Sequence, residues 1–315
     1  MDKLNSISIQ SSQKLSDIKK NEFSTIHFFG FGLITINIYF ASTLFRKYHP
    51  KLIFGTTGFN ADGVEGIKRK RFSSLAFKIL SDFDYIVCIS DQLFKSWSDY
   101  FIDSHSPKVV KIFNPVNLLK YNYVETLSQN KTLKLNYTGN ISSRKQILFL
   151  LKSIKLAQKK YGVFFKLTIV GTYKKNKDYM EKVRKFIEAN QMNDYVEFVG
   201  YKLNTEEYYK NSDIFIFASK IEGMPNVVIE AMASGLPIIM REIKGVSESL
   251  VEPNNNGFIV ENEEEMADKI WYYHKHKDIL KNHSLNSRQK AIDNFHPDKT
   301  YKKYFELYSH NKSSN

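Results

Sequence analysis

The sequence predicts an α/β protein made of two parallel-sheet domains. Short apolar runs rich in Val, Ile and Phe alternate with amphipathic stretches of helix length. Runs of this kind, separated by helix-length segments, are typical of sheets built from βαβ units. A polar stretch at residues 118–131 follows a turn signal at 114–117 and divides the chain there. A chain of 315 residues also has the length of two ordinary domains.

Ten apolar runs are interpreted as strands, with four before the polar stretch and six after it. The ten runs are 25–29, 51–56, 84–90, 109–113, 133–138, 165–170, 195–199, 214–218, 237–240 and 257–260. Functional sites of open parallel sheets lie beyond the carboxyl ends of the strands. We therefore expect the site in loops that follow strands, in a cleft between the two domains.

The composition favours a globular protein with anionic partners. Hydrophobic residues make up 42% of the chain, and the formal net charge is +13. A basic chain favours phosphates, nucleic acid or an anionic membrane surface. The positive excess is spread over both halves, and no RNP-like, zinc-finger or helix-turn-helix pattern accompanies it. Nucleic acid is therefore not an expected partner.

Cysteine usage and hydropathy bear on the compartment. Cys88 is the single cysteine, so no intramolecular disulfide can form, which fits a reducing compartment. Residues 1–24 are polar, so no signal peptide is expected there. The most apolar stretch, 28–45, is shorter than the ~20 residues that span a bilayer and is interpreted as a buried helix. A cytoplasmic protein is expected, either free or peripheral on the inner membrane face.

Residues 214–240 carry the clearest chemical pattern. A buried strand is followed by a loop, by Pro225 at the expected first helical position, by a helix over 226–234 and by Gly235 as its stop. A helix N-terminus offers free N–H groups to a phosphate, and Gly223 allows close approach of the backbone. Glu222 lies in the loop, and Glu230 is placed about two turns into the helix. Carboxylates accept paired hydrogen bonds from vicinal hydroxyls, so this pair suits the two sugars of a sugar nucleotide.

At these residues the sequence resembles the family 4 retaining glycosyltransferases of the GT-B fold. Glu222 and Glu230 form an E-x7-E motif, and the surrounding pattern continues through residues 224–226 and 230–237. Further matching positions occur in order over roughly 131–310. The alternative is an ordinary surface helix with two solvated glutamates. The resemblance implies two Rossmann-like domains facing a cleft, the N-terminal one truncated.

The resemblance also implies roles for individual residues. Glu222 would contact the donor sugar close to the reacting carbon, and Glu230 would bind the ribose hydroxyls. The donor would also face four positions around the start of the helix: Gly223, Met224, Pro225 and Asn226. Retention implies that the acceptor attacks from the face that the nucleotide leaves. No catalytic metal is required in such relatives, and the expected donor is UDP-linked.

A second candidate site follows the strand at 133–138. Cations there would stabilise the nucleoside diphosphate that leaves, and the family pattern places a glycine and an arginine early and a lysine late in this loop. Gly139 and Lys145 match that pattern, whereas Asn140 replaces the arginine. Arg144 either compensates for this replacement or is a solvated loop charge.

The first domain departs from the family pattern. It begins where roughly the fourth strand would be, so we expect a shortened acceptor-side domain. Thr57 stands where many relatives have a histidine, and His27 is interpreted as a core or rim residue. Asp82 and Asp84 spell D-x-D, but they precede a strand rather than follow it, so a structural role is favoured over a metal site. Gly30 and the residues after it are interpreted as a turn rather than a dinucleotide fingerprint.

A basic cluster at 68–71 precedes an apolar-faced helix at 72–80. This arrangement suits an anionic membrane surface, while the alternative is a solvated charge run beside a core helix. We expect domains at 1–125 and 126–295, with a C-terminal helix in 296–315 that packs back on the first domain.

The sequence thus predicts a retaining glycosyltransferase of the hexosyl- or N-acetylhexosaminyl-transferase class. It would move a sugar from a nucleoside-diphosphate sugar to a carbohydrate or lipid-linked acceptor in surface polysaccharide biosynthesis. One alternative is a non-catalytic donor-binding or scaffold subunit, and a partner subunit that completes the first domain is a further expectation. Another alternative is a nucleotide-sugar epimerase of the same fold, for which no catalytic acids are identified.

Overall fold

A computed structural model describes residues 25–30, 51–58, 62–104, 107–123, 132–174 and 176–309. The chain divides into two compact units. One comprises Met1–Ile89, Leu93–Ile112 and Phe305–Asn315, and the other comprises Ser90–Gln92 and Phe113–Tyr304. The expected domain boundary at 125/126, most of the apolar stretch 28–45 and the leader segment 1–24 lie outside the described residues.

The first unit contains a parallel sheet with the strand order β1-β2-β3-β4. Its described strands are β1 (Thr25–Phe29), β2 (Lys51–Gly55), β3 (Tyr85–Cys88) and β4 (Lys108–Lys111). The described helices of this part of the chain are α3 (Val64–Lys68), α4 (Ser73–Ser81) and α5 (Asp91–Tyr100). Trp97 is fully buried and packs edge-on against the rings of Phe54 and Phe77, which joins α4 and α5 to the sheet.

The second unit contains a parallel sheet with the strand order β10-β9-β8-β5-β6-β7. Its strands are β5 (Lys134–Thr138), β6 (Lys166–Val170), β7 (Val196–Gly200), β8 (Ile214–Phe217), β9 (Ile238–Arg241) and β10 (Gly257–Val260). Its helices are α6 (Ile147–Tyr161), α7 (Lys177–Ala189), α8 (Glu206–Lys210), α9 (Asn226–Ala233), α10 (Ser247–Leu250), α11 (Glu263–Lys275) and α12 (Lys277–Phe295), and α13 (Pro297–Ser309) follows.

The strand order of the second unit changes direction between β5 and β8. The chain runs outward from β5 to β6 and β7, and then returns to pair β8 with the other side of β5 through Leu135↔Ile214 and Asn136↔Phe215. Because all of these strands are parallel, the loops that follow β5 and β8 emerge side by side at one edge. Such a switch point is where open α/β sheets bind their ligands.

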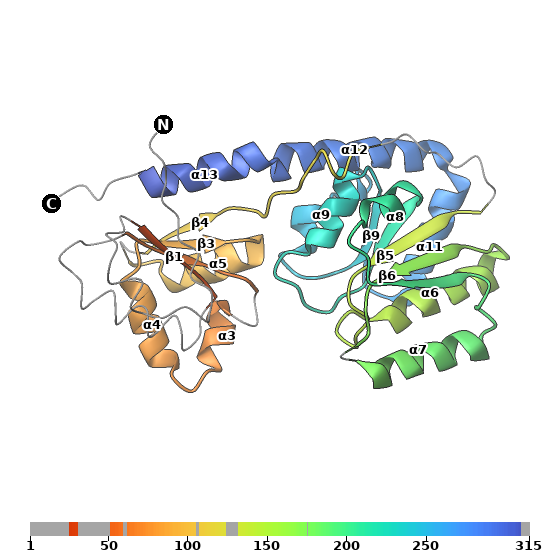
Figure 1. The fold of residues 1–315 in the computed structure, drawn as a ribbon, viewed down its shortest axis with the longest axis horizontal. Coiled ribbons are helices and arrows are strands. Elements are labelled where there is room, and N and C mark those ends of the chain that lie inside the picture. The colour runs from red at the N-terminus through yellow and green to blue at the C-terminus, as the bar shows by residue number, and fades with distance from the viewer. Residues whose placement is uncertain are drawn as a thin grey trace. The chain divides into compact units, whose positions relative to one another are not determined.

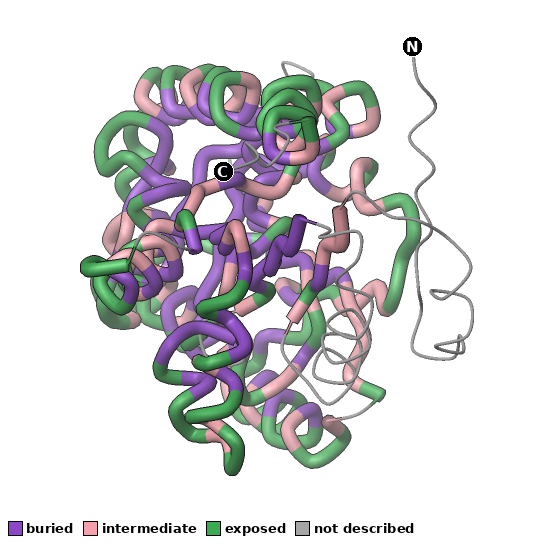
Figure 2. The backbone as a smooth tube through the Cα atoms, turned by 90° about the vertical axis from the view of Figure 1, so that its left-hand side faces the viewer, coloured by how far each residue is buried: buried purple, intermediate pink, exposed green. Residues whose placement is uncertain are grey.

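Helices cover the second sheet, and their apolar faces form the core. Helix α6 packs against α11, and α9 packs against α12 (Figure 1). The residues of β8 are all buried. Buried and exposed residues alternate along the helices of the described chain (Figure 2). Continuous apolar strands such as β8 are expected where a parallel sheet is covered on both faces.

The structure confirms the predicted α/β fold with two Rossmann-like parallel sheets, and each of the ten predicted strands is present within two residues of its predicted ends. A C-terminal helix was expected within 296–315 and is observed at Pro297–Ser309. Its end belongs to the first unit, where Lys51 Nζ donates a hydrogen bond to the carbonyl oxygen of Leu307 at 2.6 Å.

Candidate sugar-nucleotide site

The loop after β5 is held in one conformation by its glycine. The N–H of Gly139 donates to the carbonyl of Val170 at 2.8 Å, and Gly139 has a φ of +148°. A Cβ atom here would lie 2.9 Å from the Tyr137 hydroxyl oxygen, which itself donates to the carbonyl of Asn140 at 3.0 Å. Only glycine fits this position without displacement. Gly139 and Asn140 therefore begin a firmly held loop at the switch point.

The far end of this loop meets the loop that follows β8. Lys145 Nζ donates to Glu222 Oε1 at 2.6 Å, and each of the two side chains is 11% exposed. Arg144 Nη1 lies 3.8 Å from Glu222 Oε2, but the Arg144 side chain is 57% exposed. The two cations and the carboxylate come from motifs 77 residues apart. The structure thus brings together three side chains that were predicted from separate segments.

Backbone and hydroxyl contacts tie the two loops together. The N–H of Lys220 donates to the carbonyl of Arg144 at 3.0 Å. The fully buried Ser219 donates its hydroxyl proton to Glu222 Oε1 at 2.5 Å. Glu222 is therefore oriented by both Lys145 and Ser219. A carboxylate fixed in this way costs little to reorganise when a ligand arrives.

The start of α9 differs in detail from the sequence prediction. Pro225 is extended (φ −78°, ψ 99°) and caps the helix, so it is not the first helical residue as predicted. Helix α9 begins at Asn226, and Glu230 is its fifth residue. At 3.6 residues per turn, Glu230 lies just over one turn into the helix, and the predicted two turns were wrong.

The residues around this helix start are closely packed. Met224 and Pro225 are buried and Gly223 is half-buried. The exposed Asn226 accepts a hydrogen bond through Oδ1 from Asn114 Nδ2 at 2.8 Å. The N–H of Val228 donates to the carbonyl of Pro225 at 3.0 Å, whereas those of Asn226 and Val227 have no hydrogen-bond partner among the described residues and can donate to an anion.

The C-terminal end of α9 stops where predicted. Gly235 has a φ of +79°, its N–H donates to the carbonyl of Met232 at 2.9 Å, and the N–H of Leu236 donates to that of Ala231 at 3.0 Å. This is the Schellman arrangement, in which a left-handed residue ends the helix. The C-terminal end of this short helix is thus capped by its own backbone, whereas its N-terminal end can hydrogen-bond to a ligand.

Glu230 has its own set of partners. The hydroxyl of Tyr209 donates to Glu230 Oε2 at 3.0 Å. Burial raises the pKa of Glu230 above its ordinary value, while hydrogen bonds from Tyr209 and Tyr121 and the charge of Lys120 oppose the rise. Neither tyrosine was predicted from the sequence, because a tyrosine near apolar strands resembles any other core aromatic residue.

In the first unit, a buried carboxylate accepts hydrogen bonds from the two residues at 57 and 58, which follow β2. Asp62 is 1% exposed and accepts hydrogen bonds from the N–H of Thr57 at 2.8 Å, from the Thr57 hydroxyl at 2.6 Å and from the N–H of Gly58 at 2.9 Å. This role of Asp62 was not predicted. Thr57 is therefore held by a carboxylate through both its N–H and its hydroxyl.

The D-x-D segment has a structural contact. The Asp84 carboxylate accepts a hydrogen bond from the N–H of Leu52 at 2.8 Å, which links β2 to the start of β3. Within the described ranges, no group of three or more His, Cys, Asp or Glu side chains is placed to hold a metal ion. In the same part of the chain, no helix is both long and apolar enough to cross a membrane.

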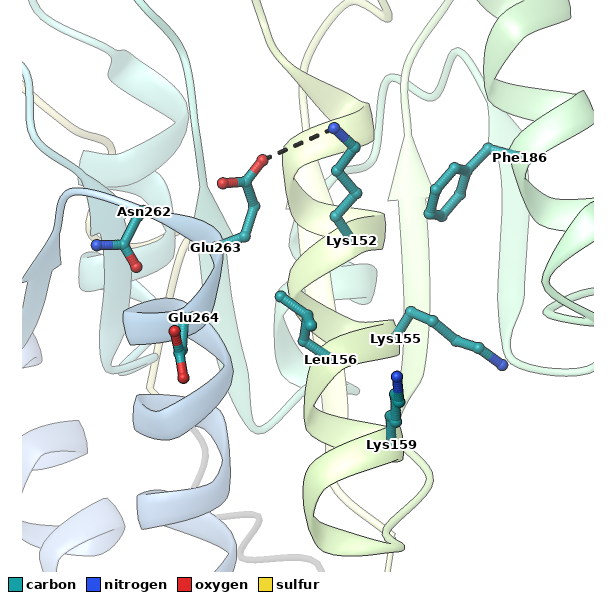
Figure 3. Close-up of a pocket in the computed structure, with 8 residues that line it drawn as sticks. All are labelled: Lys152, Lys155, Leu156, Lys159, Phe186, Asn262, Glu263 and Glu264. Carbon is teal, nitrogen blue, oxygen red and sulfur yellow. Dashed lines mark ion pairs between the residues drawn. The ribbon is translucent and has the colours of Figure 1, made fainter.

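A hollow on the surface of the second unit lies apart from the predicted residues. It is formed by α6, α7 and the start of α11, and Figure 3 shows Lys152, Leu156 and Phe186 around it, with Glu263 on the facing helix. None of its eight lining residues belongs to the loops after β5 and β8. Its chemistry is a mixture of apolar surface and opposed charges, which gives it no clear preference for an anion.

A parallel sheet with a cationic loop, a helix start and two carboxylates near its switch point is the arrangement of an open α/β protein with a candidate ligand site. Residues 132–276 match the family model described as Glycosyl transferases group 1. The predicted resemblance to GT-B glycosyltransferases is thereby confirmed. The matched range contains both loops, with Gly139, Lys145, Glu222 and Glu230.

Two relatives and two solved structures illustrate the resemblance. An uncharacterized glycosyltransferase of Haemophilus influenzae is 34% identical over 186 residues, which cover 58% of this chain and 50% of the relative. The capsular polysaccharide biosynthesis glycosyltransferase CapH of Staphylococcus aureus is 29% identical over 167 residues, or 51% of this chain and 45% of the relative. The chain thus spans about half the length of these curated relatives.

The solved structures agree on the fold. A glycosyltransferase from Rickettsia africae superimposes with a TM-score of 0.80 at 20% identity, covering 98% of this chain and 85% of that one. The Anabaena protein Alr3699/HepE, solved in complex with UDP, superimposes with a TM-score of 0.73 at 17% identity, covering 86% of this chain and 74% of that one. At such identities the similarity establishes the fold.

Proposed function

We propose that the chain is a retaining glycosyltransferase that takes its sugar from a UDP-linked donor. The observation that carries the proposal is the meeting of Lys145 and Arg144 with Glu222 at the switch point of the second sheet. Two cations beside an open helix start suit a diphosphate, and a fixed carboxylate next to them suits the hydroxyls of the sugar attached to it. The relatives named above include a capsular polysaccharide enzyme and a protein bound to UDP, which supports a UDP-sugar as donor and a surface polysaccharide as product.

In this proposal the residues divide the work as follows. Lys145, Arg144 and the N–H groups at the start of α9 stabilise the negative charge that develops on the leaving nucleoside diphosphate. Glu222 orients the donor sugar, and Glu230 binds the ribose. The acceptor is a carbohydrate or a lipid-linked sugar. Because protein cations and N–H groups carry this stabilisation, we expect donor turnover to persist in EDTA.

Calorimetry and product analysis test the proposal. The full chain is titrated with UDP-, GDP- and ADP-linked sugars, and slow hydrolysis of the bound donor is followed by release of the nucleotide. We expect a UDP-sugar to bind and to be hydrolysed slowly, with hydrolysis lost in Glu222→Ala. NMR of the released sugar, read before it mutarotates, should show the anomer of the donor. If no nucleotide sugar binds, the proposal fails.

The alternative is a non-catalytic donor-binding subunit. A non-catalytic subunit would bind the donor but would neither hydrolyse it nor transfer the sugar to any acceptor until a second protein is added. The same calorimetry thus separates the two functions once a panel of acceptors is added.

We also propose that the first unit docks on an anionic membrane through a patch defined by Arg69, Arg71, Phe72 and Leu75. All four side chains are exposed, with Phe72 at 55% and Leu75 at 38%, and no acidic residue lies between Glu65 and Asp82. Exposed apolar side chains among cations suit an interface with anionic lipid.

Vesicle sedimentation tests this patch. We expect the chain to sediment with phosphatidylglycerol vesicles, to remain in solution with phosphatidylcholine vesicles, and to lose binding when Arg71→Gln and Phe72→Ser are combined. Phe164→Ser, at a phenylalanine that is 48% exposed in the second unit, is the matched control and should bind as the wild type does. Equal sedimentation with both vesicle types would rule the patch out.

A further inference from the structure

Tyr209 is a fully buried residue that donates a hydrogen bond to the Glu230 carboxylate. Its side chain is 0% exposed, and its hydroxyl donates to Glu230 Oε2 at 3.0 Å. The same hydroxyl oxygen lies 3.4 Å from the carbonyl of Val227, one turn earlier in α9. A hydroxyl has a single proton, so the short contact with the charged carboxylate takes it.

The ring of Tyr209 is fixed by packing on two sides. It meets the rings of Tyr121 and Phe215 edge-on, with centroids 5.9 Å apart in both cases. Phe215 is a central residue of β8 and is fully buried. The phenol therefore has no room to turn away, and its hydroxyl keeps one direction toward α9.

Tyr121 adds a second contact from the segment that precedes β5. Its hydroxyl lies 3.1 Å from Thr205 Oγ1. Tyr121 also opposes the rise in the pKa of the Glu230 carboxyl, so its phenol lies on the same side as that group. Thr205 immediately precedes α8, the short helix that carries Tyr209. Two tyrosines from different segments thus converge on one carboxylate.

A carboxylate has about four lone-pair directions, and two tyrosyl donors fill at most two of them. The remaining pair can accept two hydrogen bonds from adjacent hydroxyls. Resting on the donor site proposed above, we propose that Tyr209 is a positioning residue for the nucleotide ribose: its hydroxyl orients Glu230 so that the carboxylate accepts from both ribose hydroxyls. Loss of the Tyr209 hydroxyl should then weaken binding of the ribose diol more than it weakens binding of the rest of the nucleotide.

A merely structural tyrosine would act differently. Removing it would lower the thermal stability of the protein and would reduce the affinity for all nucleotides by the same factor. A positioning tyrosine changes the ratio of affinities for UDP and 2′-deoxy-UDP, since 2′-deoxy-UDP lacks one of the two hydroxyls that Glu230 reads. The affinity ratio is therefore the readout that separates these roles.

The experiment titrates UDP and 2′-deoxy-UDP into the full chain and into Tyr209→Phe. For Tyr209→Phe we expect UDP to bind about tenfold more weakly, the size of one hydrogen bond to a charged group, and 2′-deoxy-UDP to lose less than about threefold. The matched control is Tyr208→Phe, the adjacent tyrosine, whose carbonyl oxygen rather than its hydroxyl accepts the side-chain hydrogen bonds that the described residues make to it. It should keep the wild-type ratio.

Each other outcome overturns the inference at an identifiable point. If the wild type prefers UDP to 2′-deoxy-UDP and Tyr209→Phe keeps the same affinity ratio, Tyr209 has no positioning role. The proposed function is unaffected by that result. If the wild type does not bind UDP, both the proposed donor site and the positioning role of Tyr209 are ruled out. Should Tyr209→Phe unfold at assay temperature, 3-fluorotyrosine at position 209 keeps the ring and the hydroxyl but makes the phenol a stronger donor. An unchanged affinity ratio in that protein would equally overturn the inference.

Discussion

Glu222 lies between two cations and a buried hydroxyl, and this setting determines what its charge does. Lys145 and Ser219 hydrogen-bond to the same oxygen, Oε1, and Arg144 is nearest to Oε2. The sequence could predict that Lys145 and Glu222 serve one site, because each belongs to a recognisable motif. It could not predict their contact or the role of Ser219, because both depend on which strands become neighbours in the sheet.

Replacing Glu222 by Gln should have opposite effects on binding and on turnover. In the proposed site the carboxylate competes with a diphosphate for Lys145, so Glu222→Gln should bind UDP at least as tightly as the wild type does, while donor hydrolysis is lost. Lys145→Met should instead weaken UDP binding by about tenfold or more, since it removes a charged partner of the phosphate. Calorimetry and nucleotide release measure both quantities. Weaker UDP binding in Glu222→Gln would contradict this account.

His27 makes the stability of the chain depend on pH. Burial lowers the pKa of His27 from 6.5 to about 4, and its Nδ1 lies 2.9 Å from the Tyr308 hydroxyl oxygen. The unfolded chain therefore takes up a proton before the folded chain does. As the pH falls from 6.5 toward about 4, the free energy of unfolding should decrease by up to about 3 kcal/mol.

Urea unfolding of the wild type and of His27→Gln across this pH range measures the effect. The difference between the two proteins should change through the stated window and level off below it. A difference that is independent of pH would show that His27 titrates alike in the folded and unfolded states.

At the scale of elements, α9 is the part of the site whose boundaries the sequence defined best. Gly235 indicated its end, and the Schellman contacts are observed there. Its start was misplaced by one residue, because proline suits both the cap and the first helical position and only the backbone angles separate them. Tyr209 was missed for a related reason, since the pairing of its helix with α9 is a tertiary property.

Gly235→Ala should destabilise the chain by more than about 1 kcal/mol. A left-handed residue other than glycine is strained, and an added Cβ atom would lie 2.1 Å from Cδ2 of Tyr123. Gly162→Ala is the matched control, because Gly162 ends α6 at a φ of +66° and, apart from its chain neighbours and its own helix, no described residue has an atom within 4 Å of its Cβ position. Urea unfolding should show the larger decrease in the free energy of unfolding for Gly235→Ala. Equal decreases in the two variants would show that the Tyr123 ring moves aside without loss of stability.

At the scale of the whole molecule, the two sheets could be predicted because parallel strands are buried on both faces and stand out as short apolar runs. The strand order could not be read from those runs, and it is the order that places the loops after β5 and β8 side by side. The residues proposed to bind the donor all lie in the second unit, from Gly139 to Glu230.

Hydrogen exchange with and without UDP should reflect this division. UDP should protect the amides of the loops 139–146 and 219–226 and of α9, whereas peptides of the sheet β1-β2-β3-β4 should exchange at unchanged rates. Mass spectrometry of peptic fragments provides the measurement. Protection confined to the first sheet would place the nucleotide elsewhere.

The central claim is that the loops after β5 and β8 hold the diphosphate while Glu230 holds the ribose. A crystal structure of the chain with UDP tests it most directly. The account predicts phosphate oxygens within hydrogen-bond distance of Lys145 Nζ and the first N–H groups of α9, with both ribose hydroxyls on Glu230. UDP bound with its phosphates away from Lys145, or with its ribose away from Glu230, would contradict it.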